Sequence, residues 1–188
     1  EDFLDFEAIT LECLGLDTYA DVYLNGQLLI LADNFFVAYE KEVKPLLKVG
    51  ENQIRIFFHS PITVGLQALS KHKYGLPATN DQSERGGLGD KKVSVFLRKP
   101  GYHFGWDWGP NLPPSGISRR IYIEFLNTAR VQEVIVNQKH FENIAVLEIT
   151  AFIEKFCEKD IDYEITLTAP NGDCVLRNGK CCNKIAEI

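Results

Sequence analysis

The sequence has no methionine and no long apolar run among its 188 residues. A transmembrane helix needs about 20 consecutive apolar residues, and no such stretch is present, so we expect no membrane partner. Basic residues are outnumbered, 20 against 26 acidic ones, and the net charge of −6 is spread along the chain. Nucleic acid binding needs a basic patch to meet the phosphates, so we expect no nucleic acid partner either. Because the chain starts at Glu1 and lacks methionine, we expect a segment of a longer protein.

Cysteine is scarce and irregularly spaced. The five cysteines are Cys13, Cys157, Cys174, Cys181 and Cys182. A structural zinc site needs paired ligands at short regular spacing, which this pattern does not provide. We therefore expect mostly free thiols that pack as small apolar side chains, and no metal. The glycine-rich stretch 85–91 lacks the Gly-Lys-Ser/Thr ending of a phosphate-binding loop, and no cofactor is expected.

What the sequence has in abundance is alternation of apolar and polar residues, the pattern of half-buried strands. In 19–24, every second residue is apolar and predicted to face the core. The dipeptide at 25–26 is Asn-Gly, which supplies the positive φ angles of a two-residue hairpin turn, and a second Asn-Gly follows at 171–172. Residues 92–99 are predicted to form another strand.

Two stretches depart from this pattern. After Pro61, apolar residues recur every three to four positions up to Leu69, which predicts a short helix. Residues 74–90 are polar and rich in glycine, and loops of this length are usually functional or mobile. Beyond residue 128, short strands follow one another evenly, so we expect an all-β protein with a domain over 1–128 and a second one over 129–188.

The stretch GYHFGWDWGP, residues 101–110, holds both tryptophans of the chain on either side of one carboxylate. Alternation predicts a strand in which Trp106 and Trp108 face one way and Asp107 the other. A sugar-binding surface is the alternative, because an indole packs on the apolar face of a pyranose and a carboxylate accepts hydrogen bonds from its hydroxyls. Arg98 and Lys99, just before this stretch, are expected to form exposed ion pairs with Asp107 or Asp90.

Several motifs together resemble the N-terminal part of the β-mannosidases of glycoside hydrolase family 2. They are GLDTYADVYLNG (15–26), ADNFFVAYEKEVKPLLKVGEN (32–52), FHSPI (58–62) and RKPGYHFGWDWGP…SGI (98–117). The GWDWGP run is the most specific of these. The chain departs from the family pattern at Phe35, where methionine is common, and at Ser118, where tryptophan is common.

The resemblance implies a jelly-roll (galactose-binding-like) β-sandwich over 1–128, truncated at its N-terminus. A partial immunoglobulin-like β-sandwich over 129–188, truncated at its C-terminus, would follow. It also implies a missing catalytic (β/α)₈ barrel as intramolecular partner, which would carry both catalytic glutamates. A typical barrel of this kind has about 250 residues and does not fit in this chain. We therefore expect no catalytic residue here and no activity of the chain alone.

For the site, the resemblance implies that the jelly roll supplies a loop to the pocket of the whole enzyme, which acts on β-mannoside glycans. Trp106 and Asp107 would bind the substrate, and Trp108 would anchor the loop. His103 would support the site, with a purely structural histidine as the alternative. Two other functions stay open: a stand-alone carbohydrate-binding module, and an architectural sandwich, which a fully buried Trp106 and an internally paired Asp107 would support.

Overall fold

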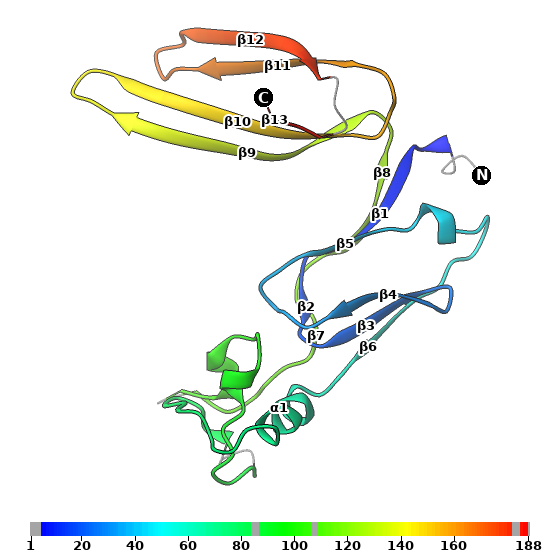
Figure 1. The fold of residues 1–188 in the computed structure, drawn as a ribbon, viewed down its shortest axis with the longest axis vertical. Coiled ribbons are helices and arrows are strands. Elements are labelled where there is room, and N and C mark those ends of the chain that lie inside the picture. Colours follow the sequence, from blue (N-terminus) through cyan, green and yellow to red (C-terminus); the bar gives the residue numbers. More distant parts are fainter. Residues whose placement is uncertain (1–4, 84–86, 107–108, 182–184, 188) are drawn as a thin grey trace. The chain divides into compact units, whose positions relative to one another are not determined.

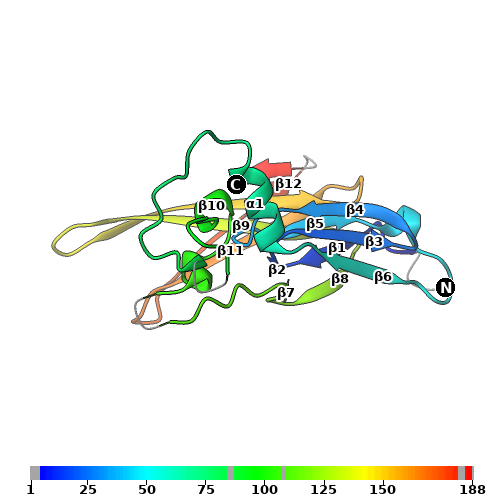
Figure 2. The same ribbon diagram turned by 90° about the horizontal axis from the view of Figure 1, so that it is seen from below.

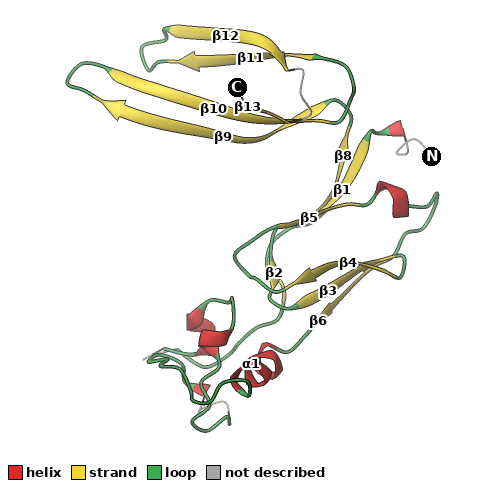
Figure 3. Ribbon diagram, viewed as in Figure 1, coloured by secondary structure: helices red, strands yellow, loops and turns green. Residues whose placement is uncertain are grey.

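A computed structural model describes residues 5–83, 87–106, 109–181 and 185–187 of the chain. In this part of the chain strands predominate and α1 is the one α-helix, which confirms the predicted all-β class (Figure 3). The strands are β1 (Ala8–Cys13), β2 (Leu16–Asp17), β3 (Ala20–Leu24), β4 (Gln27–Ala32), β5 (Tyr39–Glu42), β6 (Ile54–Phe58), β7 (Gly116–Ile117), β8 (Ile121–Leu126), β9 (Ala129–His140), β10 (Ala145–Lys155), β11 (Ile161–Thr168), β12 (Cys174–Cys181) and β13 (Ile185–Glu187). The helical elements are α1 (Pro61–Leu69) and the short 3₁₀ helices η2 (Lys44–Leu46), η4 (Ser94–Phe96) and η5 (Gly101–Phe104).

The chain divides into two units, which are described separately: residues 10–124, and residues 125–188 together with the first nine. The predicted domain boundary at residue 128 stays a prediction. The strand orders are β4–β3–β6, β5–β1–β8, β2–β7, β13–β10–β9 and β11–β12, and the last two sheets lie within the second unit.

The β4–β3–β6 sheet forms as the alternation predicts (Figure 1). Ala20, Val22 and Leu24 are all at most 1% exposed, whereas the intervening side chains of β3 are only partly buried. Asn25 and Gly26 have φ angles of 52° and 85°, the values that a two-residue hairpin turn between β3 and β4 requires. These three apolar side chains therefore contribute a row of the core that the sequence alone reveals.

The predicted helix is present as α1, whereas the predicted strand at 92–99 is wrong. Ser60 caps α1 by accepting a hydrogen bond from the Thr63 backbone N–H at 3.4 Å. At 92–99 the chain forms η4 instead of a strand, because Val93 and Leu97 pack into one cluster with Phe104. Residues four apart share a face in a strand as well as in a helical turn, so the spacing of Val93 and Leu97 alone does not distinguish the two. Figure 2 shows the long loop that follows α1 arching away from the helix.

Within the second unit, β9 and β10 pair over their whole length and β11 and β12 form a hairpin. The turn of that hairpin contains Asn171 and Gly172, as predicted, and Gly172 has a φ of 93°. The buried apolar residues of this unit in the described part are Ile9, Leu126, Ala151, Ile153 and Cys181. The immunoglobulin-like assignment of this unit stays a prediction.

Four of the five cysteines lie in the described part of the chain, and all four have free thiols. The same part contains no cluster of three or more histidine, cysteine or acidic side chains that could hold a metal ion. None of its helices is both long enough and apolar enough to cross a membrane. Cys182 lies outside the described residues.

The contact between α1 and η4 generates a first prediction. A Cβ at Gly65 would lie 2.7 Å from the Cβ of Val93, a distance too short for two carbon atoms. We expect Gly65→Ala to lower the stability by about 1–3 kcal/mol through overpacking, although alanine is the better helix former. Thermal unfolding checks this, with Gly75→Ala as control because a Cβ there meets nothing within 4 Å. A higher melting temperature for Gly65→Ala would contradict it.

Candidate functional site

In its described residues, 101–106 and 109–110, the tryptophan segment forms no strand, contrary to the prediction from alternation. It begins with η5, whose last residue, Phe104, is completely buried. Gly105 follows with a φ of 105° and a ψ of 172°, a conformation that is essentially restricted to glycine. Trp106 and Gly109 then exchange two backbone hydrogen bonds, of 3.4 and 3.3 Å. The burial of Phe104 and the backbone at Gly105 together prevent an extended strand here.

Trp106 is the one predicted substrate-binding residue that the structure describes. Its side chain is 36% exposed, so it is not a core residue. Asp107, predicted to bind substrate, and Trp108, predicted to anchor the loop, lie outside the described residues. Their roles stay predictions.

His103, which is predicted to support the site, lies two residues before Gly105 and is half-buried. Its ring meets Phe35 and Tyr102 edge-on, with centroids 6.0 and 4.7 Å away. Burial lowers the pKa of His103, the charge of Lys99 adds to this, and Asp17 acts against it. Its Nδ1 atom is buried and has no hydrogen-bond partner among the described residues. The ring is therefore neutral at neutral pH, and its supporting role stays a prediction.

A pocket of about 300 Å³ lies beside His103. Phe35 and Ser118, the two positions at which the chain departs from the family pattern, both line this pocket. The lining residues are Asp17, Phe35, His103, Pro114, Ser115, Gly116, Ile117 and Ser118. The pocket thus brings residues from before, within and after the tryptophan segment to one place.

Lys99 is buried, which contradicts the expected exposed ion pair. Its side chain is fully shielded and its Nζ donates hydrogen bonds to Oδ1 of Asp17 and, at 2.8 Å, to the carbonyl oxygen of Pro114. Burial lowers the pKa of Lys99, and the hydrogen bond and charge of Asp17 act against that. Arg98 does form an exposed pair, but its partner is Asp33. Lys99 therefore joins the two ends of the tryptophan segment, a role that the sequence analysis missed.

Asp81 organises the long loop between α1 and η4. It is 2% exposed, and its carboxylate accepts hydrogen bonds from the N–H and hydroxyl of Ser83 and, at 2.8 Å, from the N–H of Ser94. Burial raises the pKa of Asp81, but the hydrogen bonds from Ser83 and Ser94 together outweigh this and lower it. The next residue, Gln82, reaches the carbonyl oxygen of Trp106 at 2.5 Å. The polar loop 74–90 is thus attached to the tryptophan segment.

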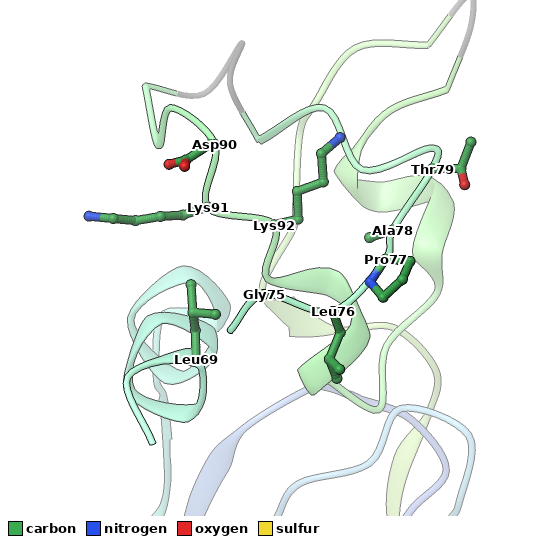
Figure 4. Close-up of a pocket in the computed structure, with 9 residues that line it drawn as sticks. All are labelled: Leu69, Gly75, Leu76, Pro77, Ala78, Thr79, Asp90, Lys91 and Lys92. Atoms are coloured by element: carbon green, nitrogen blue, oxygen red, sulfur yellow. The ribbon is translucent and has the colours of Figure 1, made fainter. Parts of the chain in front are cut away.

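A larger pocket, of about 560 Å³, lies between the end of α1 and this loop (Figure 4). Its walls include Leu69, Leu76 and Pro77, and Figure 4 shows the side chains of Lys91 and Lys92 extending to different sides. None of its lining residues is a predicted site residue. It presents no converging set of polar groups that would define a ligand.

Comparison with known proteins decides the family. Residues 1–119 match the family described as glycosyl hydrolase 2 galactose-binding domain-like. The chain belongs to this family. This match confirms the predicted galactose-binding-like fold of the first domain, and the relatives described next confirm the resemblance to family 2 β-mannosidases.

Individual relatives of this glycosyl hydrolase 2 domain are β-mannosidases. Beta-mannosidase B of Thermothelomyces thermophilus is 30% identical over 156 residues, which are 81% of this chain and 17% of that protein. A probable beta-mannosidase of Caenorhabditis elegans is 33% identical over 126 residues, 65% of this chain and 14% of the relative. The chain therefore spans about a fifth or less of the length of these relatives.

Comparison with solved structures agrees with the comparison with these relatives. The beta-D-mannosidase of Dictyoglomus thermophilum superimposes with a TM-score of 0.85 at 30% identity, over 100% of this chain and 22% of that one. A beta-glucuronidase of Bacteroides uniformis matches with a TM-score of 0.58 at 12% identity, over 100% and 19% of the two chains. The second likeness shows the fold alone.

The buried ion pair generates a prediction for Lys99→Met. Removing one partner leaves the Asp17 carboxylate buried without its counter-charge, so we expect a loss of about 3–5 kcal/mol in stability. Arg98→Met is the matched control, since an exposed pair contributes at most about 1 kcal/mol. Urea denaturation of both variants checks this. Equal losses at the two positions would contradict the burial argument.

Asp81 generates a prediction about pH. Because its pKa is lower in the folded state, the stability it contributes is present above the unfolded pKa, about 3.9, and is lost as the pH falls through the folded pKa. We expect Asp81→Asn to be less stable than the unmodified chain at pH 7 and the difference to shrink below about pH 4. Urea midpoints of both proteins at pH 7, 5 and 3 measure it. A difference that does not change with pH would show that the charge of Asp81 contributes nothing.

Proposed function

We propose that this chain is the non-catalytic N-terminal portion of a retaining β-mannosidase-type exo-glycosidase, which removes terminal β-linked mannose. In this proposal the tryptophan segment contributes to a sugar pocket whose catalytic groups lie on a (β/α)₈ barrel outside the chain. The observation that carries the proposal is Trp106, an indole that is 36% exposed on a backbone held by hydrogen bonds on both sides. The similarity to β-mannosidases supports it.

The chemistry of the segment suits such a role. The face of an indole packs on the apolar C–H face of a sugar, so Trp106 would form part of the pocket wall. Asp107 would accept hydrogen bonds from two neighbouring hydroxyls of the terminal mannose, and charge-assisted bonds of this kind are the stronger ones. Trp108 would anchor the loop and His103 would support it. A neutral His103 suits this supporting position, since it adds no charge next to Lys99.

Hydrolysis with retention needs two carboxyl groups about 5 Å apart, one as nucleophile and one as acid and base. In the proposed enzyme both belong to the barrel. The chain alone would therefore supply part of a substrate pocket and break no bond. The partial immunoglobulin-like domain over 129–188 would connect the two.

A stand-alone carbohydrate-binding module is the second candidate, and the same exposed indole favours it. Such a module would bind sugar without a partner, whereas half a pocket would not. An architectural sandwich without a ligand would not account for the exposure of Trp106.

Calorimetry and kinetics test the proposal. Titration of this chain with mannose and mannobiose is expected to give no detectable heat, because the rest of the pocket is missing. In the longer polypeptide, Asp107→Ala and Trp106→Ala are each expected to lower kcat/KM on an aryl β-mannoside by at least about tenfold, the loss of one charged hydrogen bond or of the stacking contact.

Phe36→Ala serves as control for Trp106→Ala, since Phe36 is an aromatic residue that is 66% exposed outside the segment. Turnover close to that of the unmodified enzyme for both segment variants would refute the proposed site. Strong binding of mannose by the chain alone would favour the independent module instead.

A further inference from the structure

Gln82 lies in the long polar loop 74–90 and contacts the backbone of the tryptophan segment in two places. Its backbone N–H donates a hydrogen bond of 2.8 Å to the carbonyl oxygen of Phe104. Its side-chain Nε2 donates one of 2.5 Å to the carbonyl oxygen of Trp106. These two carbonyl groups lie on either side of Gly105, so a single residue holds the chain immediately before and at Trp106.

The stem of Gln82 also fits closely against Gly105. A Cβ built at Gly105 would lie 2.9 Å from the Cβ of Gln82 and 3.1 Å from its Cγ. Any larger residue at Gly105 would therefore displace Gln82, in addition to the strain of a φ of 105°. The glycine before Trp106 is thus required by the residue that packs on it as well as by the backbone.

Gln82 is itself fixed by its neighbours in the sequence. The carboxylate of Asp81 accepts hydrogen bonds from Ser83 and Ser94, and the carbonyl oxygen of Asp81 accepts one of 2.6 Å from Lys92. Ser94 begins η4, which follows directly on the buried Val93. The support of Gln82 therefore continues into the apolar cluster of this unit.

We infer that Gln82 is a positioning residue for the sugar contact of Trp106. The direction of the Cα–Cβ bond of Trp106 follows from the placement of its own peptide groups, and Gln82 holds one of them by its carbonyl oxygen. The indole then meets the ligand in a fixed orientation, and the entropy of ordering the segment is not lost on binding. The effect on catalysis rests on the proposed function. The structural part, the placement of Trp106 by Gln82, does not depend on it.

The structural part is tested on the chain itself by hydrogen–deuterium exchange. Gln82→Ala removes the side chain, and Gln82→Glu keeps its size but replaces the donor by an acceptor at neutral pH. Both variants are expected to exchange the amides of Gly105, Trp106 and Gly109 at least about tenfold faster, since a lost hydrogen bond of typical net strength corresponds to that factor. Gln67→Ala, an exposed glutamine on α1, is the control.

Exchange in Gln82→Glu that equals that of the unmodified chain would overturn the inference. If Gln82→Ala fails to fold, Gln82→Glu still decides the question, because it removes the hydrogen bond without leaving a cavity. Melting temperatures recorded for each variant separate a local effect on the segment from a general loss of stability.

The functional part is tested by a double-mutant cycle in the longer polypeptide. If Gln82 acts through Trp106, then Gln82→Ala lowers kcat/KM on an aryl β-mannoside by about tenfold. Combined with Trp106→Ala it lowers kcat/KM no further than Trp106→Ala alone. Losses that multiply would overturn the positioning role. If Trp106→Ala and Asp107→Ala both leave kcat/KM unchanged, the proposed function fails, while the exchange experiment still judges the structural part.

Discussion

The buried ammonium group of Lys99 is the interaction on which the geometry of the tryptophan segment depends. A charge in a fully shielded position costs several kcal/mol in lost hydration, and a single counter-charge with a further acceptor offsets that cost only in one arrangement. The counter-charge is Asp17 in β2, and the further acceptor is the carbonyl oxygen of Pro114, just before β7. Because β2 pairs with β7, the ion pair and the strand pairing require the same placement of the two ends of the segment. We interpret the ion pair as fixing this placement of the two ends rather than as making a net contribution to stability.

The parts of the fold that could be predicted from the sequence are those that depend on neighbours along the chain. Ala20, Val22 and Leu24 alternate with polar residues, and the Asn25-Gly26 turn follows at once, so strand and hairpin are both local properties. The helix α1 is equally local, with a capping serine and a proline in its first turn. The family resemblance adds the galactose-binding-like fold, which no local pattern could reveal.

The parts that could not be predicted depend on contacts between distant residues. Lys99 reads as a surface residue because its partner Asp17 lies 82 positions away. Val93 and Leu97 lie in a stretch that reads as a strand, but the buried Phe104 draws both into one cluster and the chain coils into η4. Alternation misleads in the tryptophan segment for the same reason, since the conformation there is set by Gly105 and by what packs on it. Of the candidate site, the sequence indicated Trp106 but not Gln82 or Lys99, which hydrogen-bond to the backbone in and after the segment.

The supports of the segment have one property in common: they hydrogen-bond to backbone carbonyl oxygens within it or shortly after it. Gln82 takes the carbonyl oxygens of Phe104 and Trp106, and Lys99 takes that of Pro114. Leaving more than a third of an indole in water forgoes apolar burial at about 25 cal/mol for each Å². Under the proposed function, the partly exposed Trp106 on this supported backbone would meet the apolar face of a sugar, the contact for which an indole is suited.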